Sequence, residues 1–211
     1  ASIIENRLPP GSVPSGRPEP GVPKDESEPI VIGWYGNLKC SRSMKILRTL
    51  AERLPDRIRV VLYGNPSLFA IPDFMALVED LPNLEYRGKY RYPYDLERIY
   101  GELDLIWAGD FWDVRFNSRW LLPNRVYEGG YFGVPPVAPE HTETAQWVKN
   151  RSAGWTVDEL LEDSLTELLR TLSHQQIYQK RCKLLGLDRE RFVQPEQEIA
   201  DLVGQVLNRS P

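Results

Sequence analysis

Hydrophobic and polar positions follow two periods along the chain. Short β-branched and aromatic runs that end in Gly or another turn residue are typical of buried strands. Longer segments with apolar residues three or four positions apart are typical of amphipathic helices. The spacing predicts strands over residues 29–36, 57–65, 84–88, 103–109, 134–139 and 153–157. It predicts helices between them over residues 43–55, 72–82, 93–103, 122–133 and 142–150.

This alternation of strands and helices predicts the fold class. Strands that alternate with helices form a parallel sheet with helices on both faces. Six such steps in about 130 residues match one doubly wound domain. We therefore expect an α/β, Rossmann-like domain over residues 30–185, and three more helices over residues 158–173, 175–186 and 195–208. Residues 186–211 would form a helical C-terminal tail.

The N-terminal segment has a different composition. Seven of the 18 prolines fall in the first 29 residues, mixed with Gly, Ser and charged groups. Such a stretch buries too little apolar area to offset its ordering entropy. We interpret residues 1–29 as a proline-rich linker whose apolar lead, residues 2–8, is able to dock elsewhere. The chain begins with Ala rather than Met, which we interpret as a fragment or a processed chain.

Composition excludes several functional classes. The 211 residues carry a formal net charge of −4, which gives no general attraction to nucleic acid or anionic lipid. Cys40 and Cys182 lie far apart, so neither they nor His141 and His174 show metal-ligand spacing. No apolar run approaches the roughly 18 residues of a membrane helix, and no signal peptide is visible. We expect reduced thiols and a cytoplasmic protein.

Ligands of open parallel sheets bind beyond the carboxyl ends of the strands, so the strand-end loops are the candidate site. In the first loop, Gly36 allows close approach of a ligand, and Lys39 and Arg42 are suited to a phosphate. A solvated basic loop explains the same residues. The loop after Gly88 offers Lys89 and Tyr90 to a flat base, but a surface turn accounts for them equally well. No GxGxxG is present, so the nicotinamide and flavin fingerprint is absent.

A lone carboxylate, Glu128, stands in a weakly charged stretch about one turn inside the helix expected to start near Pro123. A carboxylate accepts hydrogen bonds from both neighbouring hydroxyls of a ribose. Gly129 and Gly130 each cost about 1 kcal/mol of helix stability relative to Ala, so close packing or ligand approach must require them. A solvent-facing Glu is the alternative. Asp110 and Asp113 are conceivable metal ligands, but loop acids are more often solvated.

The segment "LPNRVYEGGYFGVPPVA" resembles the donor-binding motif of retaining nucleotide-sugar glycosyltransferases of the GT-B fold. In that family a Glu-bearing helix leads into a "GVPVVA"-like strand. The first loop, "VIGWYGNLKCSRSMKIL", is similar to the same family's glycine loop, and the resemblance covers roughly residues 30–185. "NSRWLLPNRVYEGG" resembles, in particular, exopolysaccharide glycosyltransferases of the succinoglycan type.

The resemblance implies roles for individual residues. Glu128 would bind the ribose hydroxyls of a nucleotide diphosphate sugar, Gly36 would admit the diphosphate, and Arg42, with Lys39 as substitute, would neutralise it. Lys89 and Tyr90 would border the base. The helix start at residues 140–144 would supply amides to phosphate or sugar. Its two candidate positions are Thr142 and Thr144.

Two departures from the family pattern affect the sugar end of the site. Trp120 occupies the position of a second Glu, and Asn37 replaces a basic residue. Sugar contacts would then be reassigned, with three candidates in Asn117, Ser118 and Arg119, or transfer would be weakened or lost.

The function implied is the C-terminal donor-binding domain of a glycosyltransferase. Its donor would be a nucleotide diphosphate sugar, most simply a UDP-sugar, used without a metal or other cofactor. Its acceptor would be a lipid-linked oligosaccharide or polysaccharide, reached by peripheral membrane contact, and an N-terminal acceptor domain would complete the cleft. The chain alone would bind donor weakly and transfer nothing. A sugar-nucleotide epimerase and a non-catalytic nucleotide-sugar-binding domain are the alternatives.

Overall fold

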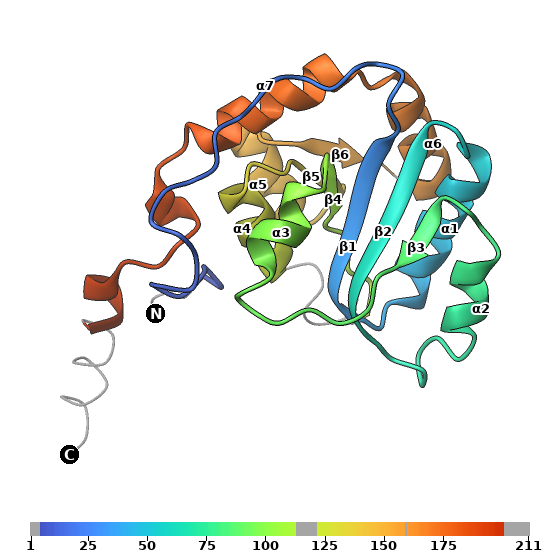
Figure 1. The fold of residues 1–211 in the computed structure, drawn as a ribbon, viewed down its shortest axis with the longest axis horizontal. Coiled ribbons are helices and arrows are strands. Elements are labelled where there is room, and N and C mark those ends of the chain that lie inside the picture. The colour runs from blue at the N-terminus through green and yellow to red at the C-terminus, as the bar shows by residue number, and fades with distance from the viewer. Residues whose placement is uncertain (1–4, 113–121, 159, 201–211) are drawn as a thin grey trace.

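A computed structural model describes residues 5–112, 122–158 and 160–200 and contains a six-stranded parallel sheet (Figure 1). The strand order is β3-β2-β1-β4-β5-β6, so the chain reverses direction across the sheet between β1 and β4. The strands are β1 (Ile30–Leu38), β2 (Ile58–Pro66), β3 (Leu84–Tyr86), β4 (Leu105–Trp107), β5 (Pro136–Pro139) and β6 (Trp155–Val157). The predicted Rossmann-like α/β fold is confirmed.

Helices cover both faces of the sheet and bury two apolar cores (Figure 1). One face carries α1 (Ser41–Arg53), α2 (Phe74–Glu79) and α6 (Leu161–Thr171). The opposite face carries α3 (Leu96–Gly101), α4 (Asn124–Tyr131) and α5 (Glu143–Arg151). Helix α7 (His174–Leu185) and the short 3-10 helix η1 (Arg189–Arg191) follow. Because both faces are covered, the central strands are almost entirely apolar.

Strands β1 and β2 are the longest and pair in parallel along their whole lengths. At their carboxyl ends Gly36 lies opposite Gly64, and both adopt positive φ angles of 108° and 135°. A side chain at Gly64 would collide with the backbone carbonyl of Gly36. This tight pairing extends β1 two residues beyond the predicted strand end, to Leu38.

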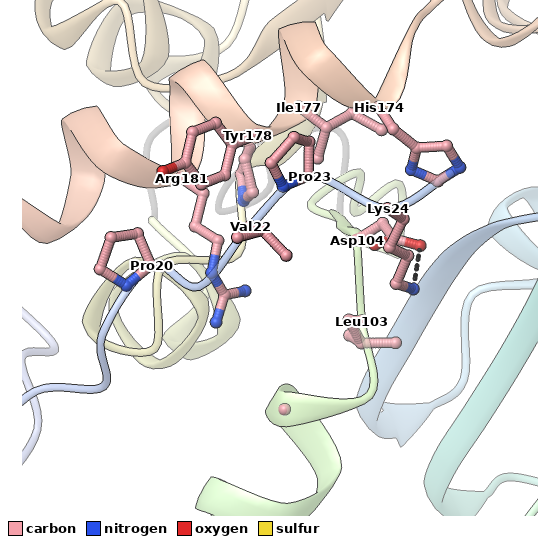
Figure 2. Close-up of a pocket in the computed structure, with 13 residues that line it drawn as sticks. Pro20, Val22, Pro23, Lys24, Leu103, Asp104, His174, Ile177, Tyr178 and Arg181 are labelled. Carbon is pink, nitrogen blue, oxygen red and sulfur yellow. Dashed lines mark hydrogen bonds and ion pairs between the residues drawn. The ribbon is translucent and has the colours of Figure 1, made fainter. Parts of the chain in front are cut away.

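The N-terminal segment is packed against the domain, contrary to the small apolar burial expected from its composition. Leu8 is 2% exposed and bridges to Val193, and Val13 is also buried. Figure 2 shows the later part of the segment between α7 and the start of β4, where the Lys24 ammonium lies 2.8 Å from the Asp104 carboxylate. Two buried apolar side chains and an ion pair therefore hold the segment in place.

Element boundaries differ from the predicted ones by a few residues at most. Helix α1 begins at Ser41 rather than Ser43, because the Cys40 thiol accepts a hydrogen bond from the Ser43 amide and acts as the N-cap. Helices α6 and α7 confirm the helical region after residue 158. Most of the last expected helix, residues 195–208, lies outside the described residues.

Candidate functional site

A cleft of about 710 Å³ opens at the carboxyl ends of β1 and β2, beside the start of α4. This is the point where the strand order reverses, which is where open α/β sheets bind ligands. A second hollow of about 200 Å³, drawn in Figure 2, lies at the opposite edge of the sheet, between the N-terminal segment and α7. Position in the fold therefore selects the first cleft as the candidate site.

Glu128 forms part of the wall of this cleft and is only 4% exposed. The hydroxyl of Tyr100, on α3, donates a hydrogen bond of 2.6 Å to Glu128 Oε2. Burial raises the pKa of the Glu128 carboxyl, while the Tyr100 hydrogen bond and the charge of Arg125 oppose that shift. The carboxylate is thus held in one orientation and faces the cleft rather than bulk water, the alternative considered from the sequence.

Arg125 lies one turn before Glu128 on α4 and also lines the cleft. Its Nε donates to the Trp107 carbonyl and its Nη2 to the Gly109 carbonyl, each at 2.8 Å. These two bonds fix the guanidinium at the end of β4. Burial lowers the pKa of Arg125, and the charge of Asp110, another cleft residue, opposes this shift.

The two glycines after Glu128 are explained by packing. A methyl group on Gly129 would lie 3.1 Å from Ile106 on β4 and 3.2 Å from the Val134 carbonyl. A methyl group on Gly130 would overlap the ring of Phe192. Their absence lets α4 approach the sheet and the C-terminal segment, and this approach places Glu128 at the cleft.

Six of the residues predicted for the site meet in this cleft. They are Gly36, Asn37, Lys39, Lys89, Tyr90 and Glu128. Gly88 lies next to it, and its carbonyl accepts the Gly64 amide at 2.9 Å. The prediction that strand-end loops from distant parts of the sequence converge therefore agrees with the geometry. Their binding roles stay predictions.

Three predicted residues are not brought into the cleft. Arg42 is exposed, and its guanidinium lies 4.6 Å from the centroid of the Phe111 ring. The Thr142 hydroxyl caps α5 by accepting from the Ala145 amide at 3.0 Å, and Thr144 is buried in the first turn of that helix. The remaining predicted sugar contacts, Asn117, Ser118, Arg119 and Trp120, lie outside the described residues, as does Asp113.

Sequence reasoning missed Arg125 and Tyr100. Arg125 received no predicted role because the motif around it was interpreted through Glu128 alone. The spacing does carry a signal, because residues three apart on a helix, such as Arg125 and Glu128, lie on the same face. Tyr100 reaches Glu128 across 28 residues, and nothing local in the sequence marks that contact.

The described residues contain neither a metal-binding cluster nor a membrane-spanning helix. No group of three or more His, Cys, Asp or Glu side chains is placed to hold a metal ion there. Within the same residues, no helix is both long and apolar enough to cross a membrane.

Comparison with solved structures defines the class of fold. The Anabaena protein HepE, solved with UDP, superposes with a TM-score of 0.65 at 14% identity over 84% of this chain and 49% of HepE. WaaG, a glycosyltransferase involved in lipopolysaccharide biosynthesis, gives 0.58 at 15% identity over 83% of this chain and 47% of WaaG. The chain has the fold of one Rossmann-like half of a GT-B glycosyltransferase.

Sequence comparison identifies a particular relative. Over 160 residues, 76% of its length, the chain is 39% identical to the succinoglycan biosynthesis protein ExoL of Rhizobium meliloti (strain 1021). The matched region is 38% of ExoL, so the chain spans well under half of that protein. No protein-family model matches the chain. The resemblance to succinoglycan-type glycosyltransferases stated from the sequence is confirmed.

Proposed function

We propose that this chain is the donor-binding domain of a glycosyltransferase that builds an exopolysaccharide or another surface glycan. The observation that carries the proposal is Glu128, a buried carboxylate held by Tyr100 at a cleft on the carboxyl edge of the sheet. Homology to a succinoglycan biosynthesis protein and the shared fold support the same function.

The donor would be a nucleotide diphosphate sugar. The carboxylate of Glu128 would accept hydrogen bonds from the two ribose hydroxyls. Tyr90 and Lys89, from the loop after β3, would border the base, and Gly36 and Asn37 would let the diphosphate approach the end of β1. The structure of Anabaena HepE contains UDP-glucose, which favours a UDP-sugar as the first donor to test.

The chemistry proposed is transfer of the sugar with release of a nucleoside diphosphate. The bond between the anomeric carbon and the diphosphate oxygen breaks, and an acceptor hydroxyl forms the new glycosidic bond and loses its proton. Cationic groups facing the diphosphate would stabilise the negative charge that develops on the leaving group. The acceptor would be a lipid-linked oligosaccharide bound mainly by another part of the protein, at the inner face of the membrane.

Titration of UDP-, GDP- and ADP-sugars against the wild-type chain tests this function. We expect one nucleotide class to bind, and Glu128→Ala to weaken that binding by roughly 1.5–3 kcal/mol through loss of two hydrogen bonds to a charged group. The matched control is Glu167→Ala, an exposed carboxylate paired with Arg170 on α6, far from the cleft. Equal affinity of wild type and Glu128→Ala would remove Glu128 from the site, and no binding by wild type would overturn the function.

The epimerase alternative is not favoured. An epimerase needs acid/base groups beside the sugar. His141 and His174 are absent from the lining of the cleft, and His174 lies at the opposite edge of the sheet with its ring bonded to the Glu28 carbonyl at 2.9 Å. The relatives described above also favour glycosyl transfer.

A further inference from the structure

We infer that Arg125 is the cation that binds the donor diphosphate in this cleft. The inference rests on the proposed function and names a residue that the family resemblance does not assign. Three observations support it: the position of Arg125 in the cleft, the environment of its charge, and the placement of Arg42 outside the cleft lining.

The first observation is the shared lining of the cleft. Arg125 lines it together with Gly36 and Asn37, the glycine loop expected to receive phosphates, and with Glu128, the proposed ribose ligand. A diphosphate joined to a ribose at Glu128 therefore lies within a cleft that already contains the guanidinium. Arg presents a planar fork of donors that suits phosphate oxygens.

The second observation concerns the charge of the guanidinium. Within the described residues, its hydrogen bonds go to the neutral carbonyls of Trp107 and Gly109, and Arg125 forms no ion pair with a carboxylate. It also stands in the first turn of α4, where the helix dipole disfavours a positive charge. The cost of a charge without a carboxylate partner and the cost of its place in the helix dipole are both reduced when an anion binds at this end of the helix.

The third observation concerns the charged residues that line the cleft and the position of Arg42. Lys39, Lys89 and Arg125 are the cations lining the cleft within the described part of the chain, against the carboxylates of Asp110 and Glu128. The two lysines are on loops and at least partly exposed, whereas Arg125 is anchored on a helix. Arg42, the expected diphosphate ligand, faces Phe111 outside the cleft lining.

The test compares ligands that differ only in phosphate. Uridine, UMP and UDP are titrated by ligand-observed NMR against wild type, Arg125→Met, Arg125→Lys and Arg42→Met, with Arg170→Met on α6 as the remote control. We expect Arg125→Met to weaken UDP binding by about 10–100-fold, the equivalent of one lost charged hydrogen-bonding group, with uridine affinity changed less than about threefold. Arg125→Lys should recover part of the UDP affinity, and Arg170→Met should match wild type.

A measurement on the wild type alone covers the case in which the Arg125 variants fail to fold. Inorganic pyrophosphate is added to ¹⁵N-labelled chain, and the Nε–H signal of Arg125 is followed. A saturable shift supports the inference, and an unchanged signal at saturating pyrophosphate overturns it. Loss of UDP binding in Arg42→Met with normal binding in Arg125→Met also overturns it while leaving the proposed function intact. Failure of the wild type to bind any nucleotide would overturn both the inference and the proposed function.

Discussion

At the scale of single residues, the decisive feature is a carboxylate that the fold itself removes from water. Glu128 is buried, accepts a hydrogen bond from the Tyr100 hydroxyl, and has a raised pKa because of its burial. In its proposed role, a side chain already held in one orientation loses little entropy when it binds a ribose, which favours affinity. The same burial costs stability whenever the carboxyl is ionised.

This cost predicts a pH dependence of stability. A carboxyl whose pKa is higher in the folded protein binds more protons when folded, so the free energy of unfolding falls as pH rises from the unfolded value of 4.5 through the folded value. Glu128→Gln has no charge to bury. Urea unfolding at about pH 4 and about pH 7.5 should show the variant gaining stability relative to wild type at the higher pH.

The control for that experiment is Glu167→Gln, since Glu167 lies exposed on α6 and pairs with Arg170 at the surface. Its effect should show no comparable gain at the higher pH. A Glu128→Gln effect that is the same at both pH values would mean that the carboxyl is not buried in its charged form.

At the scale of elements, α4 is positioned by the absence of side chains on its inner surface. Gly129 faces Ile106 of β4 and Gly130 faces the ring of Phe192. The helix propensity lost at two glycines is therefore offset by close packing, and that packing carries Arg125 and Glu128 to the edge of the sheet. Helix α4 therefore holds the residues of the candidate site on a rigid element.

Gly130→Ala should disturb the packing of α4 against Phe192. The added methyl group overlaps the Phe192 ring, so we expect a loss of about 1–3 kcal/mol in the free energy of unfolding, measured by urea titration. The matched control is Gly101→Ala in α3, where nothing lies within 4 Å of the added methyl group. It should leave stability unchanged or raise it by up to about 1 kcal/mol. Equal effects of the two substitutions would contradict the packing explanation.

At the scale of the whole molecule, the N-terminal segment joins parts of the domain that are distant in sequence. The Arg17 guanidinium donates to the carbonyls of Gly130, Tyr131, Leu185 and Leu187, with distances of 2.6–3.1 Å, and lies 4.6 Å from the Phe192 ring centroid. It thereby connects the C-terminal ends of α4 and α7. Burial lowers the pKa of Arg17 to about 10, so the group remains charged at neutral pH.

Arg17→Met should therefore destabilise the domain. Carbonyls at two helix ends lose a charged donor, and we expect a loss of roughly 2–4 kcal/mol in the free energy of unfolding. The control, Arg91→Met, removes an exposed pair with Asp95 and should change stability far less, because solvent screens surface ion pairs. Chemical unfolding of both variants measures the difference, and a cost for Arg17→Met as small as the control would show that the segment adds little to stability.

Much of the fold and part of the site could be predicted from the sequence, because periodicity, turn glycines and the order of elements are properties of neighbouring residues. They determined the parallel sheet, the edge that carries the candidate site, and the convergence of Gly36, Lys39, Lys89, Tyr90 and Glu128 there. Only the tertiary structure decided that the arginine lining the cleft is Arg125 rather than Arg42, that Tyr100 holds Glu128, and that residues 5–29 pack against the domain. These outcomes depend on contacts between residues tens of positions apart. A local pattern does not record such contacts, although it places Arg125 on the same helix face as Glu128.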